Sequence, residues 1–325
     1  MGGAVTGRPT SGTAGLPPSP LHGWIVLDKP AGLGSTDAVA SVKRLIRQAG
    51  HPRAKIGHGG TLDRLAHGVL PIALGEATKL AGVALDAAKS YSFEVAFGVE
   101  TDTLDADGAI VATSDARPTA AEVEAALPAF RGASEQLPPT YSALKVAGRR
   151  ASDRARAGED VTLATRSIHV HDLTLEPPTM SQALDRVRLH ARVSKGTYVR
   201  ALARDLACAL GTVGHVTDLQ RTAAGPFRLH GAHTLDSLGR LALGGALAQA
   251  VLPLGAALDD IPAFPLLPAQ ADALRKGQRL VGVARTPGLH LATLADVPVA
   301  LVEHDGAEVR VVRGFNLPDV EDETR

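Results

Sequence analysis

The stretch Lys55-Ile-Gly-His-Gly-Gly-Thr-Leu-Asp-Arg-Leu-Ala-His-Gly68 is the most unusual segment of this 325-residue chain. It places His58, Asp63 and His67 among four glycines. Glycine permits backbone conformations that other residues resist, and it lets a ligand approach the main chain closely. A lone aspartate in such a loop is a candidate acid, base or nucleophile. The alternative is that Asp63 only caps the following turn through its carboxylate, because Asp is favoured in turns on structural grounds alone.

Strand and helix patterns are mixed on both sides of this loop. Alternating apolar residues predict strands at 91–98 and 184–193, and a further strand is expected at 23–28. Helices are expected after Ser35 or Thr36, after the capping box of Thr119 and Glu122, and over 198–210. Because hairpin-like segments occur together with crossovers, the sequence predicts an α+β domain with a mixed sheet.

A second, smaller unit is expected at 261–316. It has a short helix at 270–276, strands near 279–284, 299–303 and 308–315, and a turn at 304–306, so it is predicted to be a small, mostly-β barrel. Residues 1–20 are mostly small and polar and are expected to form a disordered leader, and 317–325 an acidic tail. The uncharged stretch 241–258 contains glycines and a proline, which favours a packed helix followed by a loop over a membrane segment.

Charge is distributed unevenly along the chain, although 34 basic residues balance 34 acidic ones. Residues 21–90 carry nine basic against five acidic side chains (net +4), and 136–240 carry fifteen against nine (net +6). Residues 91–135 carry two against nine (net −7) and 241–325 seven against eleven (net −4). Local potential steers a charged partner more than total charge does, so zero net charge does not exclude a nucleic acid.

The densest basic stretch spans residues 145–156 and contains Lys145, Arg149, Arg150 and Arg154. Arginine forks suit bidentate contacts with phosphate. The alternative is a solvated helix or loop face, since such charge runs also occur without any partner.

Several common chemistries are excluded by missing motifs. The chain has no Gly-x-Ser-x-Gly elbow, no Gly-x-x-x-x-Gly-Lys-Ser/Thr loop and no Gly-x-Gly-x-x-Gly after a strand. His169 and His171 lie two apart but have no third ligand at a recognisable spacing, and the single Cys208 allows neither an intrachain disulfide nor a thiolate zinc site. The chemistry is therefore expected to rest on carboxylate, Arg, His and Tyr side chains, with no metal.

Taken together, the motifs of residues 22–240 resemble the TruB family of tRNA pseudouridine synthases. In chain order they are Gly23-Trp-Ile-Val-Leu-Asp-Lys-Pro-Ala-Gly32 with Ser35, Gly57-His-Gly-Gly-Thr-Leu-Asp63, Gly68-Val-Leu-Pro-Ile72, Leu74-Gly-Glu-Ala-Thr-Lys79, Lys89-Ser-Tyr91, Thr101-Asp-Thr103, Asp105-Ala-Asp-Gly108, Tyr141-Ser-Ala-Leu-Lys145, Ser194-Lys-Gly-Thr-Tyr-Val-Arg200, His215-Val with Leu219, Arg221-Thr222, and Gly225-Pro-Phe227. Several motifs in a fixed order are far more specific than any single one.

This resemblance implies a pseudouridine synthase fold with a mixed, mainly antiparallel sheet at 21–250, followed by a PUA-like RNA-binding barrel at 261–316. It implies a cofactor-free isomerisation of uridine to pseudouridine at position 55 in the T arm of tRNA. The enzyme is expected to be a cytoplasmic monomer without an obligate protein partner. The basic stretch falls in an insertion at about 137–160 that grips RNA in the family, with Lys145, Arg149, Arg150 and Arg154 as its contacts.

The resemblance also implies roles for five residues. Asp63 falls on the family's essential aspartate. Three roles stay open for it: attack on the sugar, deprotonation of the sugar, or addition to the base. Tyr91 matches the tyrosine that stacks on the target base, and Arg200 the arginine that pairs with the aspartate. His58 matches the histidine that helps fill the space left by the extruded nucleotide, and Leu219 an apolar wall of the uracil pocket.

Three positions depart from the family pattern. Arg64 stands where the family usually has proline, His67 where it has Thr or Ser, and Gln220 where it has arginine. Losing proline removes a fixed φ from the loop, so either other contacts hold the loop or turnover is altered. One alternative is therefore a tRNA-binding folding chaperone with weak or absent catalysis. Another is the guide-RNA-dependent relative, but its Lys-rich tails are not matched by the acidic end of this chain, which favours a stand-alone enzyme.

Overall fold

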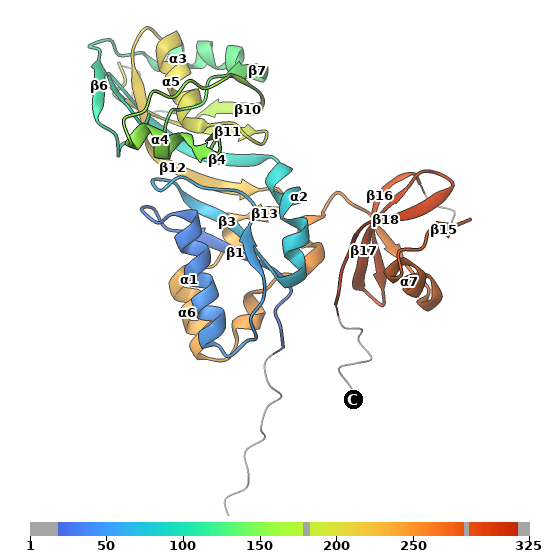
Figure 1. The fold of residues 1–325 in the computed structure, drawn as a ribbon. Coiled ribbons are helices and arrows are strands. Elements are labelled where there is room, and N and C mark those ends of the chain that lie inside the picture. The colour runs from blue at the N-terminus through green and yellow to red at the C-terminus, as the bar shows by residue number, and fades with distance from the viewer. Residues whose placement is uncertain (1–18, 178–182, 283–285, 318–325) are drawn as a thin grey trace, which may run out of the picture.

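The computed structural model describes residues 19–177, 183–282 and 286–317, which form a large unit and a small β-rich unit beside it (Figure 1). Most of the predicted leader and of the acidic tail lies outside these residues. The strands are β1 (Gly23–Lys29), β2 (Ile56–His58), β3 (His67–Leu74), β4 (Lys89–Phe97), β5 (Val99–Thr101), β6 (Ile110–Thr113), β7 (Gly132–Gln136), β8 (Lys145–Val146), β9 (Arg149–Arg150), β10 (Arg166–Leu175), β11 (Arg186–Val193), β12 (Gly214–Ala224), β13 (Phe227–Arg228), β14 (Ala263–Pro265), β15 (Leu280–Val281), β16 (Gly288–Leu294), β17 (Val297–His304) and β18 (Glu308–Gly314). The helices are α1 (Ser35–Gln48), α2 (Ala81–Asp86), α3 (Ala120–Ala126), α4 (Ala151–Arg156), α5 (Val199–Ala209), α6 (Leu235–Leu243) and α7 (Pro268–Arg275).

The large unit is built on one sheet with the strand order β1-β3-β12-β4-β11-β10-β7, to which β2 adds beside β3 and β13 beside β12. Every pairing in this sheet is antiparallel except that of β3 with β12. The predicted α+β fold with a mixed, mainly antiparallel sheet is confirmed.

Alternating side chains divide the two faces of this sheet. Phe93 and Val95 on β4 and Val187 and Leu189 on β11 are buried in the main core, as their spacing predicts. Helices α1 and α6 lie side by side over the β1 and β3 end, and α5 covers the other end (Figure 1). The loop that follows β2 lies between the start of α1 and the start of α5.

The helix starts test the capping predictions. The box at α3 is confirmed, because the hydroxyl of Thr119 accepts from the backbone N–H of Glu122 and the Glu122 carboxylate accepts in return. The predicted cap of α1 by Ser35 or Thr36 is wrong: Gly34 is the cap residue and no side chain caps the helix. The hydroxyl of Ser35 bonds instead to the loop that contains Asp63, which gives this serine a role in the site.

The small unit is a curled five-stranded sheet of order β14-β16-β17-β18-β15 with α7 packed beside it. Strand β16 was not predicted, and the strand expected at 279–284 is reduced to Leu280–Val281, with 283–285 outside the described residues. The stretch 241–258 is the end of α6 followed by two short 3₁₀ turns, Leu247–Ala250 and Leu254–Ala257, so the predicted helix and loop are confirmed in outline.

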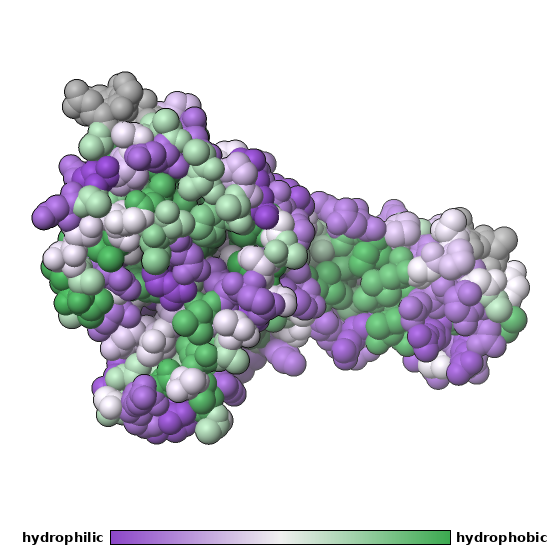
Figure 2. Space-filling model, turned by 90° about the horizontal axis from the view of Figure 1, so that it is seen from above, coloured by the Kyte–Doolittle hydropathy of each residue, from purple (hydrophilic) through white to green (hydrophobic). Residues whose placement is uncertain are grey.

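The two units share a hydrophobic core. Trp24, Phe227 and Leu254 of the large unit pack in one cluster with Leu301 and Phe315 of the small unit. Seen from above, apolar side chains also gather on the surface of the small unit next to this junction (Figure 2). None of the helices in the described part of the chain is long and apolar enough to cross a membrane.

Candidate active site

The loop between β2 and β3 carries Asp63 and is held at both ends by hydrogen bonds. The Ser35 hydroxyl donates to the carbonyl of Leu62 and accepts from its N–H, both at 2.9 Å. The backbone N–H of Gly32 donates to the carbonyl of Arg64 over 2.7 Å. These contacts flank Asp63 on both sides, so the loop is fixed without the proline that the family usually has after the aspartate.

Two buried cations lie beneath the same loop, and one of them, Arg221, holds it directly. The guanidinium of Arg221, which is 1% exposed, donates to the carbonyls of Val69 (2.7 Å), Gly60 (3.0 Å) and Thr61 (3.2 Å). Lys89 donates to three carbonyls at the end of α2 and beyond it, those of residues 84, 85 and 87. Burial, together with the nearby charge of Arg221, lowers the pKa of Lys89 to about 8.

Glycine is required where the loop returns to the sheet. Gly68 has φ +97°, and a Cβ at this position would lie 2.4 Å from the carbonyl oxygen of Arg221. A larger residue would therefore force β3 away from β12, at the pairing that joins the loop to the sheet.

A single buried arginine organises the acidic groups of the site. The Nε of Arg200 lies 2.8 Å from Oδ2 of Asp63, and its Nη1 lies 3.1 Å from Oδ2 of Asp105. The same guanidinium donates to the carbonyls of Thr103 (2.6 Å) and Tyr141 (2.9 Å). The side chain of Arg200 is only 4% exposed, whereas that of Asp63 is 36% exposed. Arg200 thus orients Asp63 from the protein interior, while part of the Asp63 carboxylate stays accessible to a ligand.

Asp105 differs from Asp63 in its surroundings. Its side chain is 8% exposed, and burial raises its pKa above the ordinary value, against the lowering effects of the Thr103 hydrogen bond and of Arg200. Thr103 donates to Oδ1 of Asp105 over 2.5 Å. Asp105 therefore supports Arg200 from the wall of the first pocket and is much less exposed than Asp63.

Asp63 lies where two pockets meet. The first, of about 570 Å³, is polar and is lined by His58, Arg64, Arg150 and the start of α1. The second, of about 430 Å³, is lined by Tyr91, Leu219, Lys89, Arg221 and Tyr198. Residues 61–63 and Ala143 line both pockets. A ribose placed at Asp63 would have room for its base on one side and for the rest of the chain on the other.

The structure brings together all five residues to which the resemblance gives roles. Tyr91 and Leu219 line the second pocket with Asp63, and His58 lines the first. Burial and the charge of Arg221 lower the pKa of His58, which favours its neutral imidazole form at neutral pH. The neutral ring offers one donor and one acceptor to a ligand.

The predicted RNA contacts of the basic stretch divide into two sets. Arg150 reaches the first pocket, and so does Arg156, which was not among the predicted contacts. Arg149 and Arg154 instead both pair with Glu159, at 2.6 and 2.7 Å. Lys145 is exposed on the short hairpin of β8 and β9. Arg149 and Arg154 would have to leave Glu159 before either could hold a phosphate.

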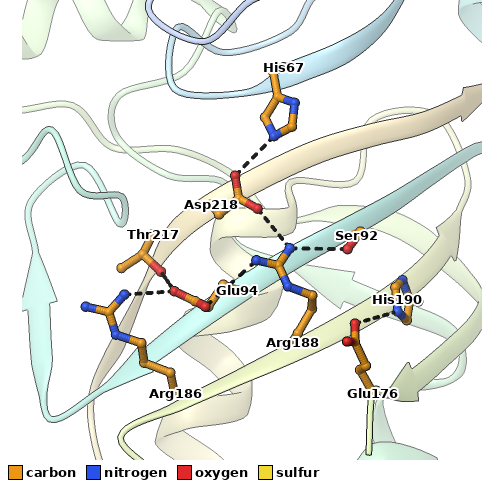
Figure 3. A network of polar contacts seen from close by, with 9 residues as sticks. All are labelled: His67, Ser92, Glu94, Glu176, Arg186, Arg188, His190, Thr217 and Asp218. Carbon is orange, nitrogen blue, oxygen red and sulfur yellow. Dashed lines mark hydrogen bonds and ion pairs between the residues drawn. The ribbon is translucent and has the colours of Figure 1, made fainter. Parts of the chain in front are cut away.

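His67 joins a polar network on the opposite face of the sheet (Figure 3). Its Nε2 lies 3.1 Å from Oδ1 of Asp218, whose other oxygen accepts from Arg188 at 2.8 Å. Arg188 continues to Glu94, which also accepts from the hydroxyl of Thr217. His67 therefore points away from the pockets and ties the end of the loop that carries Asp63 to β12, next to Leu219.

The other two departures lie at the same end of the sheet. Arg64 is exposed at the rim of the first pocket, and Gln220 pairs in register with His67.

The two histidines considered as metal ligands, His169 and His171, stack on each other with ring centres 4.6 Å apart. Within 19–177, 183–282 and 286–317, no group of three or more His, Cys, Asp or Glu side chains is arranged to hold a metal ion.

Comparison with known proteins agrees with this arrangement. The model of the TruB family pseudouridylate synthase N-terminal domain matches residues 43–199, and that of the tRNA pseudouridylate synthase B C-terminal domain matches residues 200–259. The chain is 56% identical over 305 residues to tRNA pseudouridine synthase B of Zymomonas mobilis, covering 93% of this chain and 99% of the relative.

The chain belongs to the TruB family of pseudouridylate synthases.

A second relative of this TruB-family chain, tRNA pseudouridine synthase B of Novosphingobium aromaticivorans, is 58% identical over 301 residues, which are 92% of this chain and 99% of that one. Among solved structures, an H/ACA RNP bound to a substrate RNA containing 2′-deoxyuridine matches with a TM-score of 0.69 at 23% identity, covering 92% of this chain and 86% of that one. A Cbf5-Nop10-Gar1 complex matches with a TM-score of 0.68 at 24% identity, covering 91% and 85%. These structural matches show the fold.

Sequence reasoning did not assign the residues that support the site. Lys89 and Arg221 appeared only as parts of motifs, and Asp105 only as part of an acidic turn. Lys29, which appeared only within the first motif, is fully buried and donates to the carbonyls of Pro30 and Leu33. The signal that could have indicated these buried cations is a charged residue at an inward-facing position of an alternating strand, because such residues are rarely buried unless they are paired.

Proposed function

We propose that this protein isomerises uridine to pseudouridine at position 55 in the T arm of tRNA, with Asp63 as the essential carboxylate. The observation that carries the proposal is the half-exposed Asp63 paired with the buried Arg200, at the meeting point of two pockets in a chain of the TruB family. The uracil is detached from its ribose, turned while still held, and rejoined through C5.

The geometry supports a role for each neighbour. A uridine in a folded arm must leave its stack before its sugar can be reached, at a cost of about a few kcal/mol. Stacking on Tyr91, with Leu219 as the wall beside it, offsets part of this cost. His58 and Arg150 line the polar pocket on the other side of Asp63, where the flanking backbone would lie. Arg200 keeps Asp63 in one orientation while the base turns.

We further propose a monomer that acts in the cytoplasm without an obligate protein partner. Residues 21–250 would form the catalytic domain, with about 137–160 as its RNA-gripping insertion, and 261–316 would be a PUA-like RNA-binding domain. The free position of Lys145 and the reach of Arg150 support the insertion as a contact.

The test measures tritium release from tRNA that carries uridine labelled at C5. The wild type is expected to release tritium, and Asp63→Asn to lose at least about 1,000-fold in rate, because the amide keeps the shape and loses the charge. Asp185→Asn removes the same charge at an exposed ion pair with Arg117, outside both pockets, and serves as the matched control.

The second candidate, a folding chaperone without catalysis, rests on the substitutions at Arg64 and His67. It predicts that the wild type binds and refolds tRNA but releases no tritium, and that Asp63→Asn refolds tRNA equally well. Release by the wild type that Asp63→Asn abolishes decides for the enzyme. The anchoring of the loop by Ser35 and Gly32 favours the enzyme as well.

A further inference from the structure

A second basic surface lies at the far end of α1, away from Asp63. There a groove of about 650 Å³ runs between the last turns of α1 and the segment that leads into β2. Its lining includes Lys43, Arg44, Arg47 and Arg53, together with His51, and contains no acidic residue. The floor of the groove is apolar, so the cations stand along its rim.

The basic side chains of this groove are not neutralised within the protein. Lys43, Arg47 and Arg53 form no ion pair with any acidic side chain in the described residues, and Arg44 bonds to the hydroxyl of Ser41 at 3.2 Å. All four are exposed. Arg149, in the stretch predicted to grip RNA, is by contrast already paired with Glu159. The groove therefore presents more uncompensated positive charge than the predicted insertion does.

The groove and the polar pocket beside Asp63 lie at the two ends of one helix, α1. Thr36 and Asp37 in the first turn of α1 line the polar pocket beside Asp63, and Arg47 in the last turn lines the groove. The same holds for β2, where His58 lines the pocket and Ile56 the groove. With 14 residues, α1 spans about 20 Å. A chain bound at Asp63 would therefore extend along about the length of α1 to reach the groove.

The arrangement of the charges fits a polyanionic chain. Lys43, Arg44 and Arg47 are exposed side by side on two successive turns of α1, with Arg53 across the groove. Guanidinium forks bind phosphate in two-pronged contacts. Charges spread along a rim over an open groove suit successive phosphates of a backbone, whereas a small anion needs donors that converge on one point.

From these observations we propose that the α1 groove binds the phosphate backbone of the tRNA outside the loop that enters the catalytic cleft. This inference rests on the proposed function, since the position of the RNA in the cleft determines where the rest of the tRNA lies. Binding here would add affinity without reading sequence, because phosphate contacts position a nucleic acid and base contacts specify it. It would also distinguish a whole tRNA from a short stem-loop.

The experiment compares Arg44→Gln/Arg47→Gln with Arg117→Gln/Arg186→Gln. Both pairs remove two positive charges, but Arg117 and Arg186 lie outside both pockets and are already paired with Asp185 and Glu94. The dissociation constants of full-length tRNA and of an isolated T-arm stem-loop are measured at several salt concentrations. Pseudouridine formation by the wild type is measured in the same samples.

The groove variant is expected to bind full-length tRNA about 10-fold more weakly, with a slope of log K against log salt shallower by about 1 to 2. Its affinity for the stem-loop is expected to stay within about twofold, and the control pair is expected to match the wild type. Unchanged affinity and slope for full-length tRNA, or equal weakening for both RNAs, would overturn the proposal. If the wild type forms no pseudouridine, the proposed function fails, while the binding constants still test the groove.

Discussion

Replacing Arg200 by methionine tests the central arrangement of the site. The substitution keeps most of the side-chain volume and removes the guanidinium that contacts Asp63 and Asp105 and the two carbonyls of residues 103 and 141. Breaking a buried ion pair leaves an uncompensated charge and costs about 3–5 kcal/mol. Asp105 accounts for most of this cost, because Asp63 is 36% exposed and water screens its charge.

A second substitution shows how much of the lost stability is due to Asp105. Arg200→Met/Asp105→Asn removes the buried carboxylate as well, so we expect it to recover about half of the lost stability. Activity is not expected to return, because Asp63 still lacks the group that orients it. We expect kcat to stay at least about 100-fold below that of the wild type.

The pH dependence of stability gives an independent check. Burial raises the pKa of Asp105 above its unfolded value, so the folded state keeps this proton at a pH where the unfolded state has lost it. This contribution is therefore favourable at low pH and is lost as pH rises above about 3.8. The loss should be larger in Arg200→Met and absent once Asp105→Asn is added.

Urea unfolding between pH 3.5 and 7 measures the stabilities, and tritium release measures activity. Arg204→Met is the matched control, since Arg204 lies one turn further along α5 and pairs with Asp205 in a more exposed position. We expect it to cost about 1 kcal/mol or less. The reasoning is refuted if Arg200→Met costs no more than this control, or if the double variant is less stable than Arg200→Met alone.

Two other predictions concern the buried cations beneath the loop. Arg221→Lys keeps the charge, but a lysine cannot reach the carbonyls of residues 60, 61 and 69 together. We expect the free energy of unfolding in urea to fall by about 3 kcal/mol, and kcat to fall at least about 10-fold with little change in KM. A wild-type kcat would contradict this prediction. Burial lowers the pKa of Lys89 in the folded state to about 8 from 10.5. As the pH rises, the folded state therefore loses this proton before the unfolded state does. The free energy of unfolding should then rise by up to about 3 kcal/mol between pH 8 and 10.5. Lys89→Met should lack that part of the rise, and an identical pH profile for the two proteins would show that Lys89 is not perturbed.

Sequence patterns predicted some of the regular elements of the large unit, including β1, β4, β11, α3 and α5, but not the central strands β3 and β12. The alternation in β4 and β11 gives the buried face directly, and the capping box of Thr119 and Glu122 fixes the start of α3. The cap of α1 could not be predicted, because Ser35 bonds to Leu62, a residue 27 positions away. Only the fold brings that partner to the helix.

The candidate site was predicted for a different reason. His58, Asp63, Tyr91, Arg200 and Leu219 were assigned from ordered motifs, and the structure gathers them around two pockets. Local patterns do not reveal which partner a charged side chain takes. The pairing of Arg149 and Arg154 with Glu159 and the contact of His67 with Asp218 depend on the folded geometry.

The shared core of the two units has a spectroscopic consequence. Trp24 is the single tryptophan of the chain, is fully buried, and donates its indole N–H to the carbonyl of Leu254 over 3.0 Å. It packs in the same cluster as Leu301 and Phe315 of the small unit. Movement of the small unit away from the sheet would uncover part of the cluster that surrounds this indole. The tryptophan fluorescence of the protein therefore comes from one buried site, in the core that joins the two units, and can follow that core without the attachment of a dye.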